Sequence, residues 1–180
     1  MKREYIIKSM ITICLISFAI YFGVSIAKSA IFYDMYNLNT VSGHLVQRAD
    51  INTNELSRSI YHYFQLTSYT SISYCVYLVS LIIILLLNKG KIKENGWLFM
   101  IAVLSLIFSP FELYIVYKDV DISSMIFWGK SLDINSSKIL DYMSFRSNSE
   151  YSLISSLSFL SQITIFIFAV FKPLNQNINK

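Results

Sequence analysis

The chain has 180 residues, of which 54% are hydrophobic and only 14% are charged, and its net charge is +4. Its mean hydropathy of +0.51 excludes the usual balance of a soluble domain, and its length excludes a separate large domain outside a membrane. Four apolar stretches approach the length of about 20 residues that a helix needs to cross a bilayer; they are 9–27, 69–87, 97–117 and 151–171. A backbone in lipid must satisfy its own hydrogen bonds. We therefore expect an all-α fold, an integral membrane four-helix bundle built as a single membrane domain over residues 1–180.

The first stretch carries three small residues, Ala19, Gly23 and Ala27, at intervals of four. Small side chains at this spacing share one face of a helix and let two backbones approach closely. We expect a close helix–helix contact on this face, either within the bundle or between copies of the chain. A homo-oligomer is therefore one expected form of the protein.

The second stretch is expected to be the end of a longer helix. Asn52 and Glu55 have the spacing of a capping box, in which each residue accepts a hydrogen bond from the backbone of the other. Apolar residues follow at helical spacing, and no glycine or proline intervenes before Gly90. One helix from about residue 53 to 87 would be longer than the hydrocarbon core is thick, and it would project beyond the membrane.

Charge predicts the orientation of the four spans. The three short segments carry a net charge of +6 and the two long loops carry −1; the short segments are 1–8, 88–96 and 172–180, and the loops are 28–68 and 118–150. Basic residues concentrate on the cytoplasmic side of multi-pass proteins. We expect both termini to be cytoplasmic and both long loops to lie outside, in a bacterial inner (cytoplasmic) membrane.

The middle turn contains Lys89, Lys91 and Lys93. A basic cluster beside a membrane attracts acidic protein surfaces and anionic lipid heads. These lysines are candidate docking residues for a cytosolic protein partner, and the alternative is that they only fix the topology.

The third stretch contains Glu112, the only acid inside any of the four stretches, with Pro110 two residues before it. Proline removes a backbone donor and is expected to bend the helix. Glu112 lies near the outer boundary, where we expect it to reach the interface or to pair with Lys118, Lys28 or Arg58. Ionisable residues in membrane spans are functional candidates, so a proton or ligand site is the alternative.

The second long loop is expected to contribute to a small helical extracytoplasmic cap. Residues 125–128 are apolar and aromatic, which suits the membrane interface or packing on the other loop. Ser136 or Ser137 could then begin a short helix. Its apolar face would carry Ile139, Leu140 and Met143.

The fourth stretch is the most polar. Ser155, Ser158 and Gln162 are spaced so that they share one helix face. A polar stripe is more stable against protein than against lipid, so it should point into the bundle or into an oligomer interface. A water-lined path is the alternative.

Residues that carry familiar chemistry are few. Cys14 and Cys75 lie at different depths of their spans, too far apart for a disulfide, and both are expected to be small buried side chains. His44 and His62 have no metal-ligand spacing, and no nucleotide or catalytic motif occurs. The sequence therefore predicts a protein that is not an enzyme, with no cofactor, no metal and no direct binding of nucleic acid.

In span number, length, topology and composition the whole chain resembles the membrane subunit of Kiwa-type antiphage defence. The resemblance rests on this outline and on no motif, so it assigns no role to any residue. It implies a homo-oligomeric membrane sensor that works with a cytosolic, DNA-binding partner subunit.

Three functions are therefore considered. The first is a non-enzymatic membrane sensor or scaffold that oligomerises and recruits a cytosolic partner. The second is a small channel or carrier, which the polar fourth stretch and Glu112 favour. The third is a membrane immunity protein that would use the outer loops.

Overall fold

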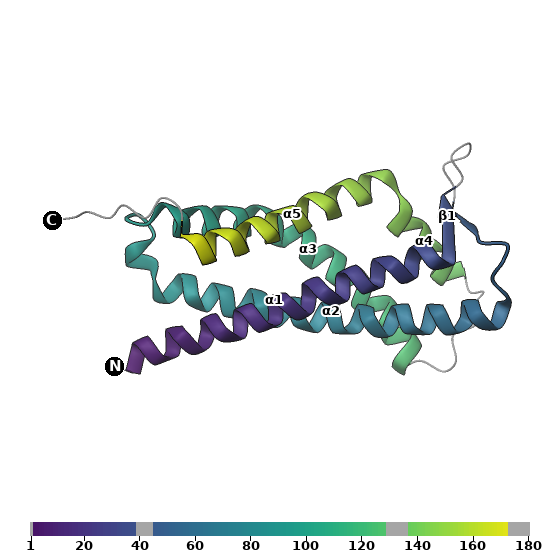
Figure 1. Cartoon of the computed structure of the whole chain (residues 1–180), viewed down its shortest axis with the longest axis horizontal. Coiled ribbons are helices and arrows are strands. Elements are labelled where there is room, and N and C mark those ends of the chain that lie inside the picture. The colour runs from purple at the N-terminus through teal and green to yellow at the C-terminus, as the bar shows by residue number, and fades with distance from the viewer. Residues whose placement is uncertain (1, 39–44, 129–136, 173–180) are drawn as a thin grey trace.

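The computed structural model describes residues 2–38, 45–128 and 137–172. Four long helices run side by side and alternate in direction (Figure 1). They are α1 (Lys2–Met35), α2 (Thr53–Leu87), α3 (Gly96–Trp128) and α5 (Ser149–Phe171), with the short helix α4 (Ser137–Ser147) between the last two. The 3₁₀ turn η1 (Lys89–Lys91) joins α2 to α3. Strands β1 (Tyr36–Leu38) and β2 (Leu45–Gln47) pair antiparallel, with Asn37 opposite Val46.

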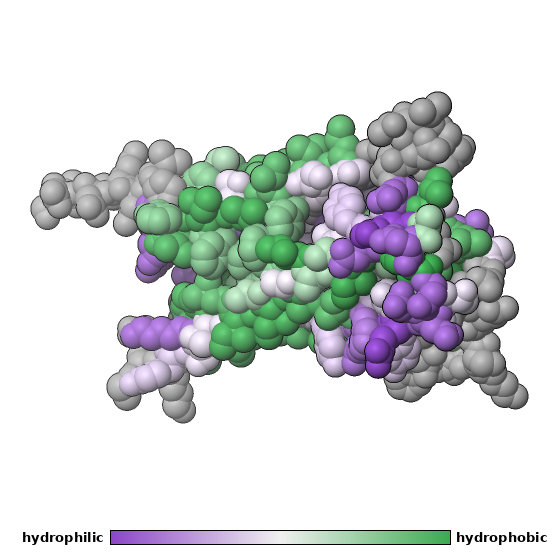
Figure 2. Space-filling model, turned by 45° about the vertical axis from the view of Figure 1, so that its right-hand side comes forward, coloured by the Kyte–Doolittle hydropathy of each residue, from purple (hydrophilic) through white to green (hydrophobic). Residues whose placement is uncertain are grey.

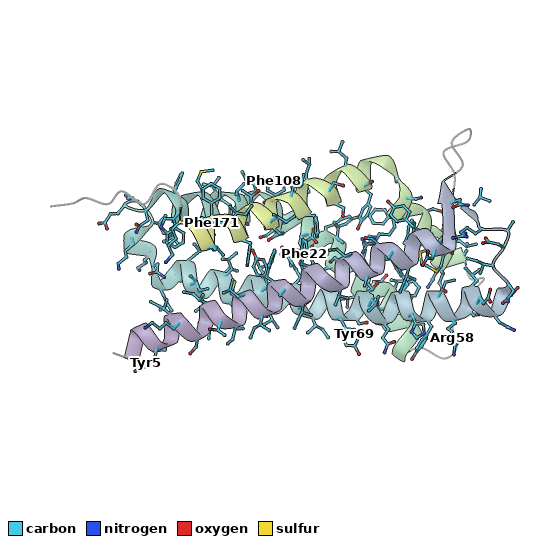
Figure 3. The ribbon with its side chains drawn as sticks, in the orientation of Figure 1. Tyr5, Phe22, Arg58, Tyr69, Phe108 and Phe171 are labelled. Atoms are coloured by element: carbon cyan, nitrogen blue, oxygen red, sulfur yellow. The ribbon has the colours of Figure 1, made fainter. Side chains whose placement is uncertain are left out.

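The two ends of the bundle differ. The start of α1, the end of α5 and η1 lie at one end, here called the η1 end, and α4 with the β ribbon lies at the other, the α4 end (Figure 1). Figure 3 places Tyr5 and Phe171 at the η1 end and Arg58 near the α4 end. The all-α prediction is confirmed, and the termini of the described chain share an end with the basic turn as expected.

Helix α2 confirms the prediction made from its capping box. Glu55 N donates to Asn52 Oδ1 at 2.9 Å, and Asn52 N donates to Glu55 Oε2 at 3.4 Å. The helix then continues without interruption for 35 residues, which is about 50 Å at 1.5 Å per residue. Two orphan backbone donors are satisfied reciprocally, so the sequence sets the start of this helix locally.

The prediction placed long loops where much of the chain is helical. Helix α1 continues to Met35 and α3 to Trp128, so parts of the expected loops 28–68 and 118–150 belong to these helices. The expected interfacial segment 125–128 is accordingly the last turn of α3, where Met125 packs against buried side chains of the α4 end. Helix α3 also passes without interruption through Pro110.

Two apolar clusters fill the interior. The first, at the α4 end, joins the extensions of α1, α2 and α3 to α4 and contains Met35, Tyr36, Leu56, Ile60, Tyr63, Phe64, Ile122, Ile139, Tyr142 and Met143. The second lies further along the bundle and contains Cys14, Phe18, Tyr21, Tyr74, Tyr77, Leu81, Ile101, Val116 and Ile165. The helical extensions persist because they bury apolar side chains in the first cluster.

Helix α4 presents a different face from the expected one. Ile139 and Met143 are buried, but Leu140 is half exposed and Tyr142 takes the inner position instead. Positions i, i+3 and i+4 share a helix face, which fits Ile139, Tyr142 and Met143 and excludes Leu140. The predicted face left out Tyr142, whose ring is buried in the core.

The surface is apolar along the middle of the bundle and polar at its ends (Figure 2). Large side chains such as Leu106, Ile72 and Phe171 are more than 60% exposed, while many serines and threonines are buried. Four helices are long and apolar enough to cross a membrane: Tyr5–Met35, Thr53–Leu87, Gly96–Met125 and Tyr151–Phe171. Such a surface is costly in water and favourable in lipid.

Candidate functional site

A cluster of buried charges lies between the two apolar clusters. One oxygen of the Asp119 carboxylate accepts a hydrogen bond from Lys28 Nζ at 3.1 Å. The other oxygen forms an ion pair with Arg146. The side chains of Lys28, Asp119 and Arg146 are only 10%, 4% and 11% exposed. Buried charges survive only when they are paired and hydrogen-bonded. We call these three residues and Tyr142 the ion network.

The ion network joins helices that are distant in the sequence. Lys28 comes from α1, Asp119 from α3, and both Tyr142 and Arg146 from α4. Tyr142 donates to Asp119 Oδ1 at 2.6 Å, and Arg146 Nε donates to the Tyr142 oxygen at 3.0 Å. Arg146 also donates to the hydroxyl of Tyr151, the residue with which α5 enters its apolar stretch. The network therefore attaches α4 to three of the four long helices.

The protonation of the α4 residues suits this arrangement. Burial raises the pKa of Tyr142, so its phenol keeps the proton that it donates to Asp119. Burial alone would lower the pKa of Arg146, but the oxygens of Tyr142 and Tyr63 and the negative charge of Asp119 favour the cation and raise its pKa. Its guanidinium also lies over the rings of Tyr142 and Tyr151, at 5.6 and 5.0 Å from their centroids.

Glu112 lies on the same side of α3 as Asp119 and is 6% exposed. One carboxylate oxygen accepts from Tyr21 of α1, and the other accepts from Ser158 of α5 at 2.7 Å. The expected pairing with Lys118, Lys28 or Arg58 is not what the structure shows. Lys28 is bonded to Asp119 and Thr70 instead, and Lys118 Nζ lies 5.7 Å from the ring centroid of Tyr114. The carboxylate therefore joins α1, α3 and α5.

Two neighbouring cavities open beside these charges. The larger has a volume of about 300 Å³ and is lined by residues of all five helices, among them Lys28, Glu112 and Asp119. The smaller has a volume of about 180 Å³ and reaches Tyr63 and Tyr151. Five residues line both cavities, so the two meet there: Lys28, Ser29, Arg146, Ser155 and Ser156.

The polar stripe of α5 points inward, as expected. Ser158 and Gln162 are 0% and 1% exposed, and Ser155 is partly buried where it lines both cavities. Several buried polar atoms, among them Gln162 Oε1, have no hydrogen-bond partner within the described part of the chain; the others are the hydroxyls of Tyr74, Tyr77, Ser105, Ser123 and Ser161. Such atoms mark places where water or a ligand completes the hydrogen bonding.

The small residues of α1 face away from the bundle. Ala19, Gly23 and Ala27 are exposed, and no described atom outside the local backbone lies within 4 Å of a Cβ built at Gly23. The expected close contact therefore does not occur within the described bundle, and a contact between copies of the chain stays a prediction.

Lys89, Lys91 and Lys93 are exposed at the η1 end, which leaves their docking role a prediction. Cys14 is buried as expected, but Cys75 is exposed on the outer side of α2, which corrects its assignment to the interior. His44 lies outside the described residues. Among those described, no three His, Cys, Asp or Glu side chains gather as they would around a metal.

Sequence reasoning missed the ion network itself. Lys28 and Asp119 each lie just beyond the end of an apolar stretch, and so they were assigned to loops. The available signal was their position: the first and third stretches run in the same direction in an alternating bundle (Figure 1), so charges just beyond their ends lie at one level, where opposite signs pair.

Comparisons with protein-family models, with curated proteins and with solved structures find no match for this chain.

Proposed function

We propose that the chain is a multi-pass protein of a bacterial inner membrane, with α4 outside and both termini in the cytoplasm. The apolar middle of the bundle supports insertion, and the charge difference supports the orientation (Figure 2). The η1 end carries the basic turn, while the α4 end carries the long segments, whose net charge is only −1. In this arrangement the ion network lies near the outer boundary of the membrane, beneath the helical cap.

The function that the site supports best is that of a non-enzymatic membrane sensor or scaffold. The observation that carries it is the attachment of α4 to α1 and α3 through one carboxylate, Asp119, and to α5 through the hydrogen bond from Arg146 to Tyr151. Removing one partner from a buried charge pair leaves an uncompensated charge, so such a junction favours discrete arrangements over gradual ones. An event outside that moves α4 would shift three membrane helices together. This role agrees with the outline shared with the Kiwa membrane subunit.

Output would occur at the η1 end. The basic turn is exposed there, so a cytosolic protein would receive the signal by docking on Lys89, Lys91 and Lys93. Copies of the chain would associate through the exposed small residues of α1, where close backbone approach is possible. Neither contact involves nucleic acid directly.

The test is a variant with Lys89, Lys91 and Lys93 all replaced by Glu, which makes docking on an acidic surface repulsive. The cytosolic partner that co-purifies with the wild-type protein should be lost from the variant and should dissociate from the wild type in high salt. The matched control replaces Lys138, exposed on α4, by Glu. Equal recovery from both variants, with unchanged topology, would contradict the docking role.

A small channel or carrier is the second candidate, because the buried hydroxyls of Tyr74, Tyr77 and Ser105 have no hydrogen-bond partner among the described residues, and the bundle that holds them also buries Glu112. Water filling these positions would form a polar path. Purified protein in liposomes distinguishes the two functions: ion or proton flux that falls in a Glu112→Gln variant would favour the channel, and tight liposomes would favour the sensor.

A further inference from the structure

The junction of the two cavities carries hydrogen-bond donors that the protein does not use. The Lys28 ammonium has three protons, and two are directed at Asp119 and Thr70, at 3.1 and 3.4 Å. Arg146 uses three of its five N–H groups on Tyr142, Tyr151 and Asp119. Each cation therefore retains a capacity to donate to a further acceptor.

Hydroxyl groups complete the same junction. Ser155 and Ser156 line both cavities, and their hydroxyls form no hydrogen bond with another described residue. Both cations line the two cavities, whereas the acids Asp119 and Glu112 line only the larger one, so positive charge is concentrated at the junction beside the serine hydroxyls. Charged donors and serine hydroxyls together are the usual ligands of a phosphate group.

The shape of the opening indicates where such a phosphate would come from. Helices α1 and α5 are joined below the cavity by two stacked ring pairs, Phe22 with Phe159 at 5.1 Å and Phe18 with Phe166 at 5.0 Å. Figure 3 shows Phe22 about midway along the bundle. Above these pairs the larger cavity is lined by Ile26 of α1 and by Ser156 and Phe159 of α5; Ile26 and Ser156 are exposed, so this lining reaches the surface of both helices.

In the proposed membrane orientation, the junction of the two cavities lies at the depth of the lipid headgroups. Lys28 follows the last residue of the first apolar stretch, and Ser155 lies one turn inside the fourth. Cations at this level of a helix meet lipid phosphates, and an apolar edge below them meets acyl chains. A site with both features, whose lining includes the exposed Ile26 and Ser156, fits a lipid better than a soluble anion.

We infer that the two cavities form a single phospholipid site, in which Lys28, Arg146 and the hydroxyls of Ser155 and Ser156 hold the headgroup phosphate. This inference rests on the proposed function in one respect, namely that the bundle spans a membrane with Lys28 at its boundary. It gives the sensor a ligand placed against the ion network, so that lipid occupancy and the position of α4 are coupled.

The test uses the full chain in detergent, with bound phosphatidylglycerol measured by native mass spectrometry as lipid is added. Ser155→Leu fills the junction without touching the ion network, and Lys28→Met removes the free ammonium proton. Their controls are Thr164→Leu on the same helix and Lys118→Met on α3, which do not line either cavity. We expect the tightest lipid to bind at least tenfold more weakly to Ser155→Leu and Lys28→Met, and unchanged to both controls.

Two results would overturn the inference. Equal lipid retention by Ser155→Leu and Thr164→Leu, both with wild-type melting midpoints, would show that lipid binds elsewhere. Competition of inorganic phosphate with the lipid at equal concentration would assign the site to a free anion instead. Reporter fusions separate this failure from that of the proposed function, because opposite compartments for the two ends of the bundle support membrane insertion whatever the lipid result.

Discussion

Replacing Asp119 by Asn tests the ion network most severely, because one carboxylate serves two buried cations. Asn keeps the shape of the side chain but removes the charge that Lys28 and Arg146 share, and those two side chains are only 10% and 11% exposed. Breaking a buried charge pair by removing one partner costs about 3–5 kcal/mol. At about 2–4 °C per kcal/mol for a chain of this size, the melting midpoint should fall by roughly 6–20 °C.

The assay is thermal unfolding in detergent followed by circular dichroism, with Asp121→Asn as the matched control. Asp121 lies two residues along α3 and is exposed, so its variant should melt like the wild type. Trypsin should also cut at Lys138 of α4 faster in Asp119→Asn, because α4 loses its attachment. If both Asn variants melt within about 2 °C of each other, the reasoning is refuted.

A triple apolar variant separates stability from specificity. Lys28→Met, Asp119→Leu and Arg146→Met together remove the buried charges without leaving one unpaired. Apolar replacement of a whole buried network is often neutral or stabilising, so the midpoint should recover at least half of what Asp119→Asn loses. A triple variant less stable than Asp119→Asn would show that the network stabilises the fold in itself.

Three further predictions concern other parts of the bundle. Glu112→Leu leaves two buried hydroxyl donors unpaired and should cost about 1–3 kcal/mol per group in thermal unfolding, and Glu112→Gln should cost less; equal costs would contradict the hydrogen-bonded role. Asn52→Ala removes the cap of α2 and should cost about 1 kcal/mol, whereas Asn54→Ala in the first turn should not; the same loss from both would argue against the capping box. Gly23→Leu should leave the melting of a single chain unchanged but reduce its association in native mass spectrometry, and an unchanged oligomer would exclude this face as the contact.

Local signals allowed much of the fold to be predicted. The start of α2 follows from Asn52 and Glu55, which satisfy each other's backbone without help from the rest of the chain. The inward face of α5 follows from the spacing of Ser158 and Gln162, because polar groups avoid lipid wherever the helix lies. The four membrane spans could be recognised in the sequence because the thickness of the hydrocarbon core sets the length of an apolar stretch that crosses it.

The candidate site could not be predicted in the same way, because its contacts are distant. Lys28 and Asp119 are 91 residues apart, and no local pattern around either residue indicates that the two form a pair. Each residue lies just beyond an apolar stretch, where the run of apolar residues stops but the helix continues. The helix continues because further residues such as Met35 and Ile122 are buried in the cluster at the α4 end.

Spacing also fails to say which helix face points inward. The intervals of Ala19, Gly23 and Ala27 were read correctly as one face, but that face is exposed. A face is defined by periodicity alone, whereas its direction depends on how the other helices pack. The partners of Glu112 were missed for a similar reason, since Tyr21 and Ser158 are uncharged and were not considered as partners for an acid.

The central claim is that the η1 end and the α4 end lie on opposite sides of a membrane. Reporter fusions that are active in only one compartment, one placed after Lys180 and one inserted at Asp50, measure this directly in bacterial cells. The account predicts a cytoplasmic signal after Lys180 and an extracytoplasmic signal at Asp50. The same compartment for both reporters would contradict it.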